Sequence, residues 1–367
     1  MASPHLDKAK SAKNDEFYTL YPDVEKEVNA YLELNPDAFK DKIIFLPCDD
    51  PEWSNFTKYF AQNFEKFKLK KVISTSYAVE SKKYKDGYQT TLFEKRNPKF
   101  DKNKTRIKGK IFTLTKDKTK DGRINIDDLD WQYLEGDGDF RSEEVKKLRD
   151  EADVIITNPP FSLFREFLKW IIEAKKQFLI IGNVNNVTYK EVFKLIKENK
   201  VWLGIKSSSK AMYFKTSDKA YASRVSSERP EGSWWKMIDG EVCIGINNSC
   251  WFTNLDHGRR HQKLPLMTMK DNLKFHSQMK NKKSYEKYDD YDAIEVPFTN
   301  AIPSDYEGAM GVPVSFLDKY NPNQFKIIGI DRYVEDNPNY GRRFTINNKE
   351  KYARILIKHK KLIKGKN

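Results

Sequence analysis

Short apolar runs alternate with segments of helical periodicity along the first 205 residues of the chain. The runs predict buried strands at 42–47, 71–76, 152–157, 177–182 and 201–205. Apolar residues three and four positions apart predict amphipathic helices at 23–32, 53–64, 162–174 and 189–197. This alternation indicates an α/β fold with a mostly parallel, doubly wound sheet, which binds ligands outside the carboxyl ends of its strands.

The remainder of the chain is less regular. Residues 242–246 and 249–253 predict two strands, joined as a hairpin across Asn247-Asn248, and further strands are predicted at 325–330 and 354–357. Residues 271–292 are polar and predict an irregular surface, and the first dozen residues are expected to be mobile.

We expect three regions along the chain. They are a catalytic core at 14–205, DNA-recognition elements with the remaining strands of the sheet at 206–310, and a C-terminal segment at 311–367 with a basic tail at 358–366.

Two basic insertions interrupt the alternation. The first, at about 78–135, is basic from Lys95 to Lys110, and alternation on both sides of Asp121-Gly122 predicts a hairpin whose strands are 111–115 and 124–126. A solvated hairpin and a positive arm that lies on DNA are equally compatible with it. The second insertion, 206–235, is rich in Ser, Lys and Arg, and we expect it to be mobile until a partner binds. DNA contacts are favoured over a disordered loop, with Lys210, Arg224 and Arg229 as candidates.

The segment Asn158-Pro159-Pro160-Phe161 carries the most specific chemistry in the sequence. It joins a predicted buried strand to a predicted helix. The exocyclic amine of a nucleobase is a poor nucleophile because its lone pair is delocalised into the ring. The side-chain oxygen of Asn158 and the carbonyl of Pro159 can accept its two N–H bonds, and the two prolines keep these acceptors stiff. Phe161 offers a face for stacking on an extruded base.

Other polar residues follow neighbouring predicted strands. The segments 48–51, 76–77 and 158–161 should gather at one edge of the sheet, since carboxyl ends of parallel strands meet there. A carboxylate of Asp49 or Asp50 could bind an ammonium group or ribose hydroxyls there, or could instead cap the helix that follows. The sequence leaves both roles open.

Several segments together resemble the EcoRI-type adenine-specific DNA methyltransferases of restriction-modification systems. The resemblance is carried, in order, by 14–19 (NDEFYT), 43–56 (IIFLPCDDPEWSNF), 136–140 (GDGDF), the segment at 158–161, 251–255 (WFTNL) and 311–322 (GVPVSFLDKYNP). It implies a Rossmann-like class I fold, S-adenosylmethionine as methyl donor and the N6 amine of a flipped adenine in duplex DNA as acceptor. The glycine-rich donor loop of the wider superfamily is absent here, and Leu46-Pro47-Cys48-Asp49-Asp50 stands in its place.

The resemblance also implies residue roles. Catalysis would rest on Asn158, Pro159, Pro160 and Phe161, and the donor's adenine would lie between Asp139 and Phe140. The full set of expected donor contacts is Phe17, Tyr18, Thr19, Pro47, Cys48, Asp49, Asp50, Ser76, Asp139, Phe140 and Asn158.

Charge and cysteine usage narrow the partners and the compartment. A formal net charge of +14 and a pI near 9.3 suit a polyanion such as double-stranded DNA. Cys48, Cys243 and Cys250 are too few and too irregularly spaced for a disulfide framework, which favours the cytoplasm. Neither a signal peptide nor a membrane span is expected, and a monomer is compatible with the sequence.

The remaining cationic loop contains Arg259 and Arg260, which we interpret as contacts to phosphate or guanine. His257 and His261 have a spacing seen in metal sites, but no cysteine or carboxylate cluster lies near them in the sequence, so no metal is expected.

Other functions compete with a DNA adenine methyltransferase that protects host or phage DNA from restriction. An RNA adenine methylase or a protein glutamine methylase could use the same loop, and a DNA-binding protein without activity could share the basic surface. An endonuclease is disfavoured, since its Mg²⁺ site usually pairs carboxylates with a lysine on a hairpin. The DNA sequence recognised and the presence of a restriction partner cannot be read from the chain.

Overall fold

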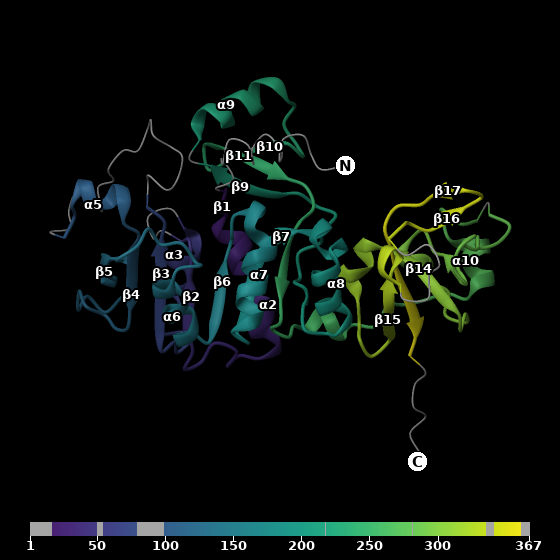
Figure 1. Cartoon of the computed structure of the whole chain (residues 1–367), viewed down its shortest axis with the longest axis horizontal. Coiled ribbons are helices and arrows are strands. Elements are labelled where there is room, and N and C mark those ends of the chain that lie inside the picture. The colour runs from purple at the N-terminus through teal and green to yellow at the C-terminus, as the bar shows by residue number, and fades with distance from the viewer. Residues whose placement is uncertain are drawn as a thin grey trace, which may run out of the picture. The chain divides into compact units, whose positions relative to one another are not determined.

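The computed structural model describes residues 17–49, 54–78, 99–216, 218–280, 282–334 and 341–360. The predictions for the first dozen residues, for Asp50, for the start of the basic stretch (95–98) and for the tail beyond 360 lie outside these ranges. The chain folds as two compact units, the first formed by Met1–Asn183 and Lys210–Leu255 and the second by Val184–Ser209 and Asp256–Asn367 (Figure 1). These units differ from the linear division at 205 and 310, because the chain passes between them more than once.

A mixed sheet forms the centre of the first unit. Its strands lie in the order β5 (Asp130–Tyr133), β4 (Lys110–Leu114), β3 (Lys71–Ser76), β2 (Ile43–Leu46), β6 (Val154–Thr157), β7 (Gln177–Asn183) and β12 (Ser249–Thr253). Only β3, β2, β6 and β7 run parallel, whereas β4, β5 and β12 are antiparallel to their neighbours. The prediction of a mostly parallel sheet is therefore too simple. Burial that alternates along β4 is typical of an antiparallel strand.

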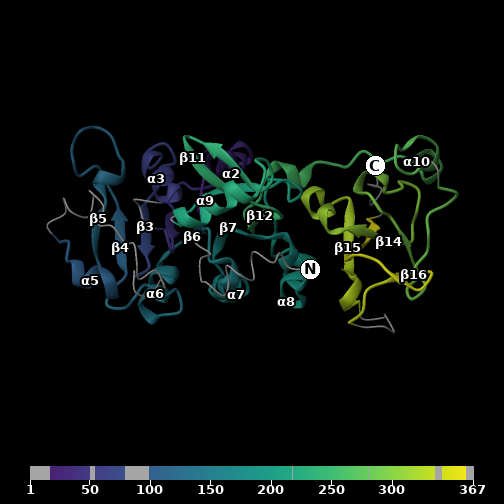
Figure 2. The same ribbon diagram turned by 90° about the horizontal axis from the view of Figure 1, so that it is seen from above.

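Helices cover both faces of this sheet, as predicted. In Figure 2, α2 (Tyr21–Leu34) and α3 (Asn55–Gln62) lie on one face, and α6 (Glu143–Glu151) and α7 (Phe164–Glu173) lie on the other. The predicted helix at 162–174 begins as a 3₁₀ turn, η2 (Phe161–Leu163), before α7. The apolar stripe of α7 includes Phe164, Phe167 and Ile171, which are buried in agreement with the helical spacing.

The antiparallel pair predicted around Asp121-Gly122 is present, but its second strand lies at 130–133 rather than at 124–126. The strand β4 pairs with β5, and a short helix α5 (Lys102–Ile107) precedes β4. Between β4 and β5 the chain forms a loop with a 3₁₀ turn, η1 (Ile126–Asp128). The Asp128 carboxylate accepts hydrogen bonds from three backbone N–H groups of this loop. These bonds replace the strand pairing that the alternating pattern at 124–126 suggested.

A second, smaller sheet belongs to the first unit. Its order is β1 (Phe17–Thr19), β9 (Met212–Thr216), β11 (Glu241–Ile246) and β10 (Trp235–Ile238), all antiparallel, and the helix α9 (Lys219–Glu228) follows β9. The insertion at 206–235 is thus largely folded, which corrects the expectation of mobility. The strands at 242–253 are correct, but they do not form a hairpin, because β11 joins this small sheet and β12 pairs with β7. The hairpin lies between β10 and β11.

The second unit has its own sheet and core. Its strands are β13 (Ala293–Glu295), β14 (Ala309–Pro313), β18 (Arg354–His359) and β15 (Phe325–Ile330), in that order, with a separate hairpin of β16 (Thr345–Ile346) and β17 (Lys349–Glu350). It also contains α8 (Lys190–Lys197), the short strand β8 (Trp202–Leu203), α10 (Met269–Phe275) and the 3₁₀ turns η3 (Val184–Thr188), η4 (Gly258–His261), η5 (Thr299–Ala301), η6 (Val314–Lys319) and η7 (Asp331–Tyr333). The helix α10 lies partly in the segment that we predicted to be irregular.

Candidate active site

Three loops meet at the carboxyl ends of the parallel strands. The Asp49 N–H donates to the Thr75 carbonyl at 2.8 Å, and the Thr157 hydroxyl donates to the Pro47 carbonyl at 2.6 Å. These bonds join the chain after β2 to the ends of β3 and β6. The structure therefore brings together the described parts of the segments 48–51, 76–77 and 158–161, as the strand pattern predicts.

The two polar atoms of the Asn158 side chain differ in their hydrogen bonding. Its amide nitrogen Nδ2 donates to the main-chain carbonyl of Phe17 at 2.6 Å. Its oxygen Oδ1 is buried and accepts no hydrogen bond within the part of the chain that the structure describes. A buried acceptor without a partner costs about 1–3 kcal/mol, so native structures seldom retain one without a functional reason. The oxygen is available to a ligand that brings its own N–H.

Other buried oxygens at the same strand ends lack partners. The hydroxyls of Thr19, on β1, and Thr75, on β3, accept or donate no hydrogen bond to any described residue. Unsatisfied polar atoms on several neighbouring elements are more typical of a ligand site than of a packed core.

Three aromatic rings pack beside Asn158. The ring centroids of Phe17, Phe161 and Phe214 are 6.0 to 6.2 Å apart in each pair. Phe214 is fully buried and Phe17 nearly so, while Phe161 is only partly buried. Of the three, Phe161 has the ring surface that a stacked base would need, whereas Phe214 is occupied as core.

The structure shows which residue of the loop after β2 caps the helix α3. Ser54 caps α3, because its hydroxyl oxygen accepts from the Phe56 N–H at 3.1 Å. The Ser54 hydroxyl in turn donates to Asp49 Oδ1 at 2.7 Å. Asp49 therefore supports the cap rather than forming it. Cys48, one residue earlier, has a φ of 66°, a conformation that a residue with a Cβ adopts at an energetic cost of about 1–2 kcal/mol.

The acidic segment at 136–140 lies against the end of β3. The Ala78 N–H donates to the Asp137 carbonyl at 2.8 Å. Gly138 has a φ of +87°, and a Cβ there would lie 2.6 Å from the Ser76 carbonyl oxygen, so only glycine fits. This close approach explains the glycine between the two aspartates and places Asp139 beside Tyr77.

Asp139 and Phe140 have different environments. The Asp139 carboxylate accepts from Arg141 Nε at 2.9 Å and Nη2 at 2.5 Å, and from the Tyr77 hydroxyl at 3.2 Å. The hydrogen bonds from Arg141 hold the pKa of this carboxyl below its usual value, while burial raises the pKa of the Tyr77 hydroxyl. Phe140 is 3% exposed and packs on Phe167 and Trp170 of α7, which leaves little of its ring for a donor.

The cationic candidates in the first unit are exposed. The Arg224 guanidinium lies 5.5 Å from the ring centroid of Tyr221, and that of Arg229 lies 4.7 Å from Trp234. Lys210 is also exposed, just before β9. These stacking contacts hold the two guanidinium groups near aromatic rings while leaving their N–H groups accessible.

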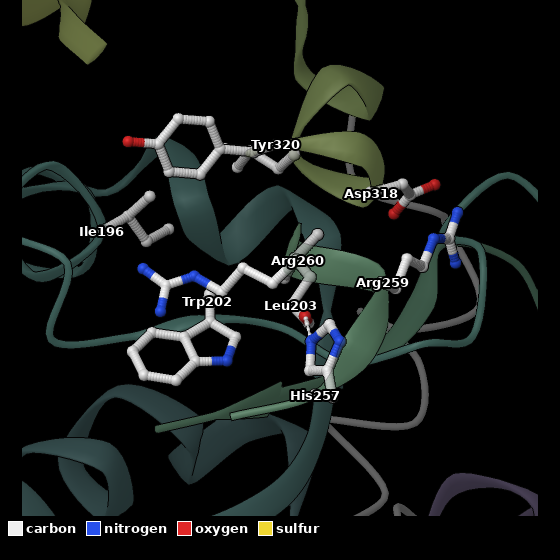
Figure 3. A pocket seen from close by; sticks show the side chains of 9 residues that line it. Ile196, Trp202, Leu203, His257, Arg259, Arg260, Asp318 and Tyr320 are labelled. Carbon is white, nitrogen blue, oxygen red and sulfur yellow. Dashed lines mark hydrogen bonds between the residues drawn. The ribbon is translucent and has the colours of Figure 1, made fainter. Parts of the chain in front are cut away.

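Arg259 and Arg260 are engaged within the second unit. Figure 3 shows the Arg260 guanidinium between Trp202 and Tyr320. Its carbon lies 3.7 Å from the Trp202 ring centroid, and its Nη2 donates to Asn199 Oδ1 at 2.8 Å. Arg259 Nη1 donates to the Ile205 carbonyl. Burial lowers the pKa of Arg260. Both arginines are only partly exposed, and each already donates a hydrogen bond within the unit.

Both histidine rings form hydrogen bonds within the fold. His257 Nε2 is hydrogen-bonded to the Leu203 carbonyl at 2.9 Å, and His261 Nε2 to Asp256 at 2.8 Å. Within the described ranges no group of three or more His, Cys, Asp or Glu side chains could hold a metal ion. None of the helices there has the length and apolarity needed to cross a membrane.

Sequence reasoning missed two parts of this site. It listed Phe17 only as a donor contact, and it did not foresee that the main-chain carbonyl of Phe17 binds Asn158. It also missed the Tyr77–Asp139–Arg141 group. The position of Arg141, two residues after Asp139, was the available signal for the latter.

Comparison with known proteins identifies relatives along nearly the whole chain. The family described as "Adenine-specific methyltransferase EcoRI" matches residues 5–360. The chain is 42% identical over 359 residues to the "Type II methyltransferase M.EcoRI" of Escherichia coli, covering 98% of this chain and 97% of that protein. It is 33% identical to M.MgeORF184P of Mycoplasma genitalium and 30% to M.MpnI of Mycoplasma pneumoniae, covering 97% or more of each chain. No solved structure matches.

Proposed function

The chain belongs to the EcoRI family of adenine-specific methyltransferases, and on that premise we propose how its site performs the reaction. The enzyme is a DNA adenine methyltransferase of the restriction-modification type. It transfers a methyl group from S-adenosylmethionine to the N6 amine of an adenine that is flipped out of duplex DNA. Family membership favours this substrate over the RNA adenine and protein glutamine acceptors that the loop alone leaves open.

The observation that carries the proposal is the unpartnered Oδ1 of Asn158. It is a buried acceptor at the end of β6, on a loop stiffened by Pro159 and Pro160. The target amine brings two N–H bonds, which Oδ1 and the Pro159 carbonyl can accept. These bonds draw the nitrogen toward tetrahedral geometry and direct its lone pair. They also stabilise the positive charge that the nitrogen gains as it is methylated.

Base flipping explains the aromatic residue that ends the loop. Adenine has to leave the helical stack, which costs a few kcal/mol, and a stacking face in the protein recovers part of this energy. Phe161 is the partly buried ring of the trio beside Asn158 and would provide that face. Phe17 and Phe214 would hold its position from behind.

The same strand ends suit the methyl donor. S-adenosylmethionine supplies an electrophilic methyl group on a sulfonium, and it carries an ammonium group, ribose hydroxyls and an adenine. We assign it to the edge formed by the loops after β2 and β3, in the manner of a Rossmann-like fold. Carboxylates there match its ammonium and hydroxyl groups, and the hydrogen bonds from Arg141 that lower the pKa of Asp139 favour its ionised form.

The residues that we assign to the donor are Phe17, Tyr18, Thr19, Pro47, Cys48, Asp49, Ser76 and Asp139. Support comes from the unsatisfied hydroxyl of Thr19 and from the bonds that join Asp49 to β3. Asp50 stays a prediction outside the described residues. Phe140 is less suitable than the sequence suggests, because its ring packs in the core.

DNA would contact the first unit through the small sheet and α9. Lys210, Arg224 and Arg229 are exposed there, and β1 of the same sheet touches Asn158 through the Phe17 carbonyl. A net charge of +14 adds affinity that does not depend on sequence, through release of counterions from the phosphates.

Replacing Asn158 tests the proposal directly. We expect Asn158→Ala to lower the rate of methyl transfer about 100- to 1,000-fold, as for loss of a preorganised contact in other enzymes. Donor affinity, measured by calorimetry, should change little. Asn63→Ala, which removes the amide at the C-cap of α3, is the control. The assignment is wrong if Asn158→Ala methylates DNA near the parental rate.

A second measurement tests the acceptor. DNA from cells that express the protein should carry N6-methyladenine in a fixed sequence context when read by single-molecule sequencing. Cells with Asn158→Ala should lack it. Methylation of RNA or protein without any DNA modification would contradict the proposed substrate.

A further inference from the structure

We propose that the main-chain carbonyl of Phe17 is a positioning group that fixes which way the Asn158 amide faces. The strand β1 then belongs to the catalytic apparatus, although it lies 141 residues earlier in the chain. This inference rests on the proposed function, because it concerns how the catalytic amide is oriented.

A carboxamide has a donor end and an acceptor end of nearly the same shape. Either end of Asn158 could face the target amine, but only Oδ1 can accept its N–H bonds. The Phe17 carbonyl is an acceptor only. It binds Nδ2 at 2.6 Å, and a flipped amide would place two oxygens against each other. The contact therefore selects the orientation in which Oδ1 faces the substrate side without a partner.

The carbonyl is held in place by its own strand. In β1, Phe17 pairs with Thr216 and Thr19 with Phe214, both on β9. Asn55 Nδ2 also donates to the Thr19 carbonyl at 2.8 Å. The Phe17 ring is 8% exposed and packs on Phe214, with 6.0 Å between ring centroids. These contacts fix both ends of the short strand, so the Phe17 carbonyl has a defined position.

The small sheet thereby links two functions. The same sheet holds β1, which orients Asn158, and leads through β9 into α9, which carries the exposed Arg224. A base bound to Phe161 and a phosphate bound to α9 would both act on this sheet. The orientation of the catalytic amide would thus depend on the part of the protein that we assign to DNA contact.

Replacing Asn158 by aspartate distinguishes two roles for its side chain. In one role only the oxygen matters, and in the other the N–H bond to Phe17 is needed as well. An aspartate at position 158 has two oxygens and would serve as an acceptor at least as well as asparagine. It has no N–H for Phe17, and its carboxylate would be repelled by that carbonyl. Only the positioning proposal expects Asn158→Asp to be inactive.

The first experiment compares Asn158→Asp with the parental enzyme in single turnovers on duplex DNA. We expect a methyl-transfer rate lower by about 100-fold, with dissociation constants for donor and DNA within about threefold of the parental values. Asn63→Asp is the matched control, because Asn63 Nδ2 also donates to a main-chain carbonyl, that of Tyr59 at 2.9 Å. A rate for Asn158→Asp within tenfold of the parental rate would overturn the proposal.

The second experiment weakens the carbonyl itself. Replacing Tyr18 by its α-hydroxy acid turns the peptide bond after Phe17 into an ester, whose carbonyl is a weaker acceptor. We expect the ester to slow methyl transfer about three- to tenfold in the parental protein and not to slow Asn158→Asp further, because interacting groups are non-additive. Equal slowing in both backgrounds would show that the ester acts through the strand and not through Asn158, and would reject the proposal.

These outcomes separate the inference from the proposed function. If Asn158→Ala stays active, the catalytic role of the loop fails. If Asn158→Ala is inactive and Asn158→Asp is active, the catalytic role stands and only the positioning by Phe17 fails.

Discussion

The four arginines that the sequence assigned to DNA have different environments in the two units. In the first unit, Arg224 and Arg229 are exposed and rest on aromatic rings. In the second unit, Arg259 and Arg260 are partly buried and donate to the Ile205 carbonyl and to Asn199. All four residues looked equally suited to DNA in the sequence. Their availability depends on whether their hydrogen bonds are already used inside the fold.

Buried polar atoms give a second comparison between the two units. The guanidinium of Arg260 ties η4 to the strand β8 through Trp202. Buried polar atoms without a partner among the described residues occur in both units, with Arg260 Nε and Asn272 Oδ1 in the second, but Asn158 Oδ1 lies at the carboxyl end of a parallel strand. A buried atom without a partner is the better candidate for function where it also lies at the edge of the sheet that binds ligands.

The largest effect that separates the two kinds of arginine is on stability. We expect Arg260→Ala to destabilise the protein by about 2–3 kcal/mol, because it removes a stacked, partly buried side chain and its bond to Asn199. DNA affinity should stay within about twofold of the parental value, since no phosphate contact is lost. Urea unfolding and a DNA-binding titration measure the two quantities.

Arg229→Ala is the matched control, with the opposite pattern expected. It should leave the unfolding midpoint almost unchanged, since exposed side chains contribute little to stability. If Arg260→Ala weakens DNA binding tenfold without loss of stability, the buried arginine is a DNA contact after all and the comparison fails.

A smaller effect is expected for the exposed pair. The double variant Arg224→Ala, Arg229→Ala should weaken DNA binding about tenfold and reduce the slope of log affinity against log salt by about 2, since each phosphate contact contributes close to 1. Unfolding should be unaffected. Binding measured from 50 to 200 mM salt would test this, and an unchanged slope would remove α9 from the DNA contacts.

The sequence predicted the centre of the fold better than its additions. The strands β2, β3, β6 and β7 were predicted within two residues, because parallel strands buried on both faces are continuous apolar runs. Strand partners were not predictable from local pattern. Neighbouring strands β11 and β12 belong to different sheets, and β1 pairs with β9 nearly 200 residues later.

The candidate site shows the same limit. The strand ends that carry Cys48, Ser76 and Asn158 were predicted to meet, and they do, since parallel strands align their carboxyl ends. The bond from Asn158 to the Phe17 carbonyl was not predictable, because any residue type presents a carbonyl. The assignments of residues to donor and DNA remain predictions.

The smallest expected effect is on the pH dependence of stability. It compares one carboxyl in each unit, Asp331 and Asp139. Burial raises the pKa of Asp331, in the second unit, to about 6, whereas hydrogen bonds from Arg141 lower the pKa of Asp139 in the first. A carboxyl whose folded pKa is raised binds a proton more tightly than the unfolded chain does. Its contribution to stability is therefore lost as pH rises from about 4 to 6. The contribution of Asp139, whose folded pKa is lowered, is instead lost as pH falls.

Lowering the pH from 7 to 5 should thus make the Asp331 contribution more favourable by about 1 kcal/mol. Because other groups titrate in this range, the test compares the change in urea midpoint between the parental protein and Asp331→Asn. The variant keeps an oxygen that can accept from the Arg332 N–H, which bonds Asp331 Oδ1 at 2.9 Å, but it cannot titrate. It should gain less stability on acidification than the parental protein. An equal gain would mean that Asp331 ionises normally in the folded state, and that its burial does not disfavour the charged carboxylate.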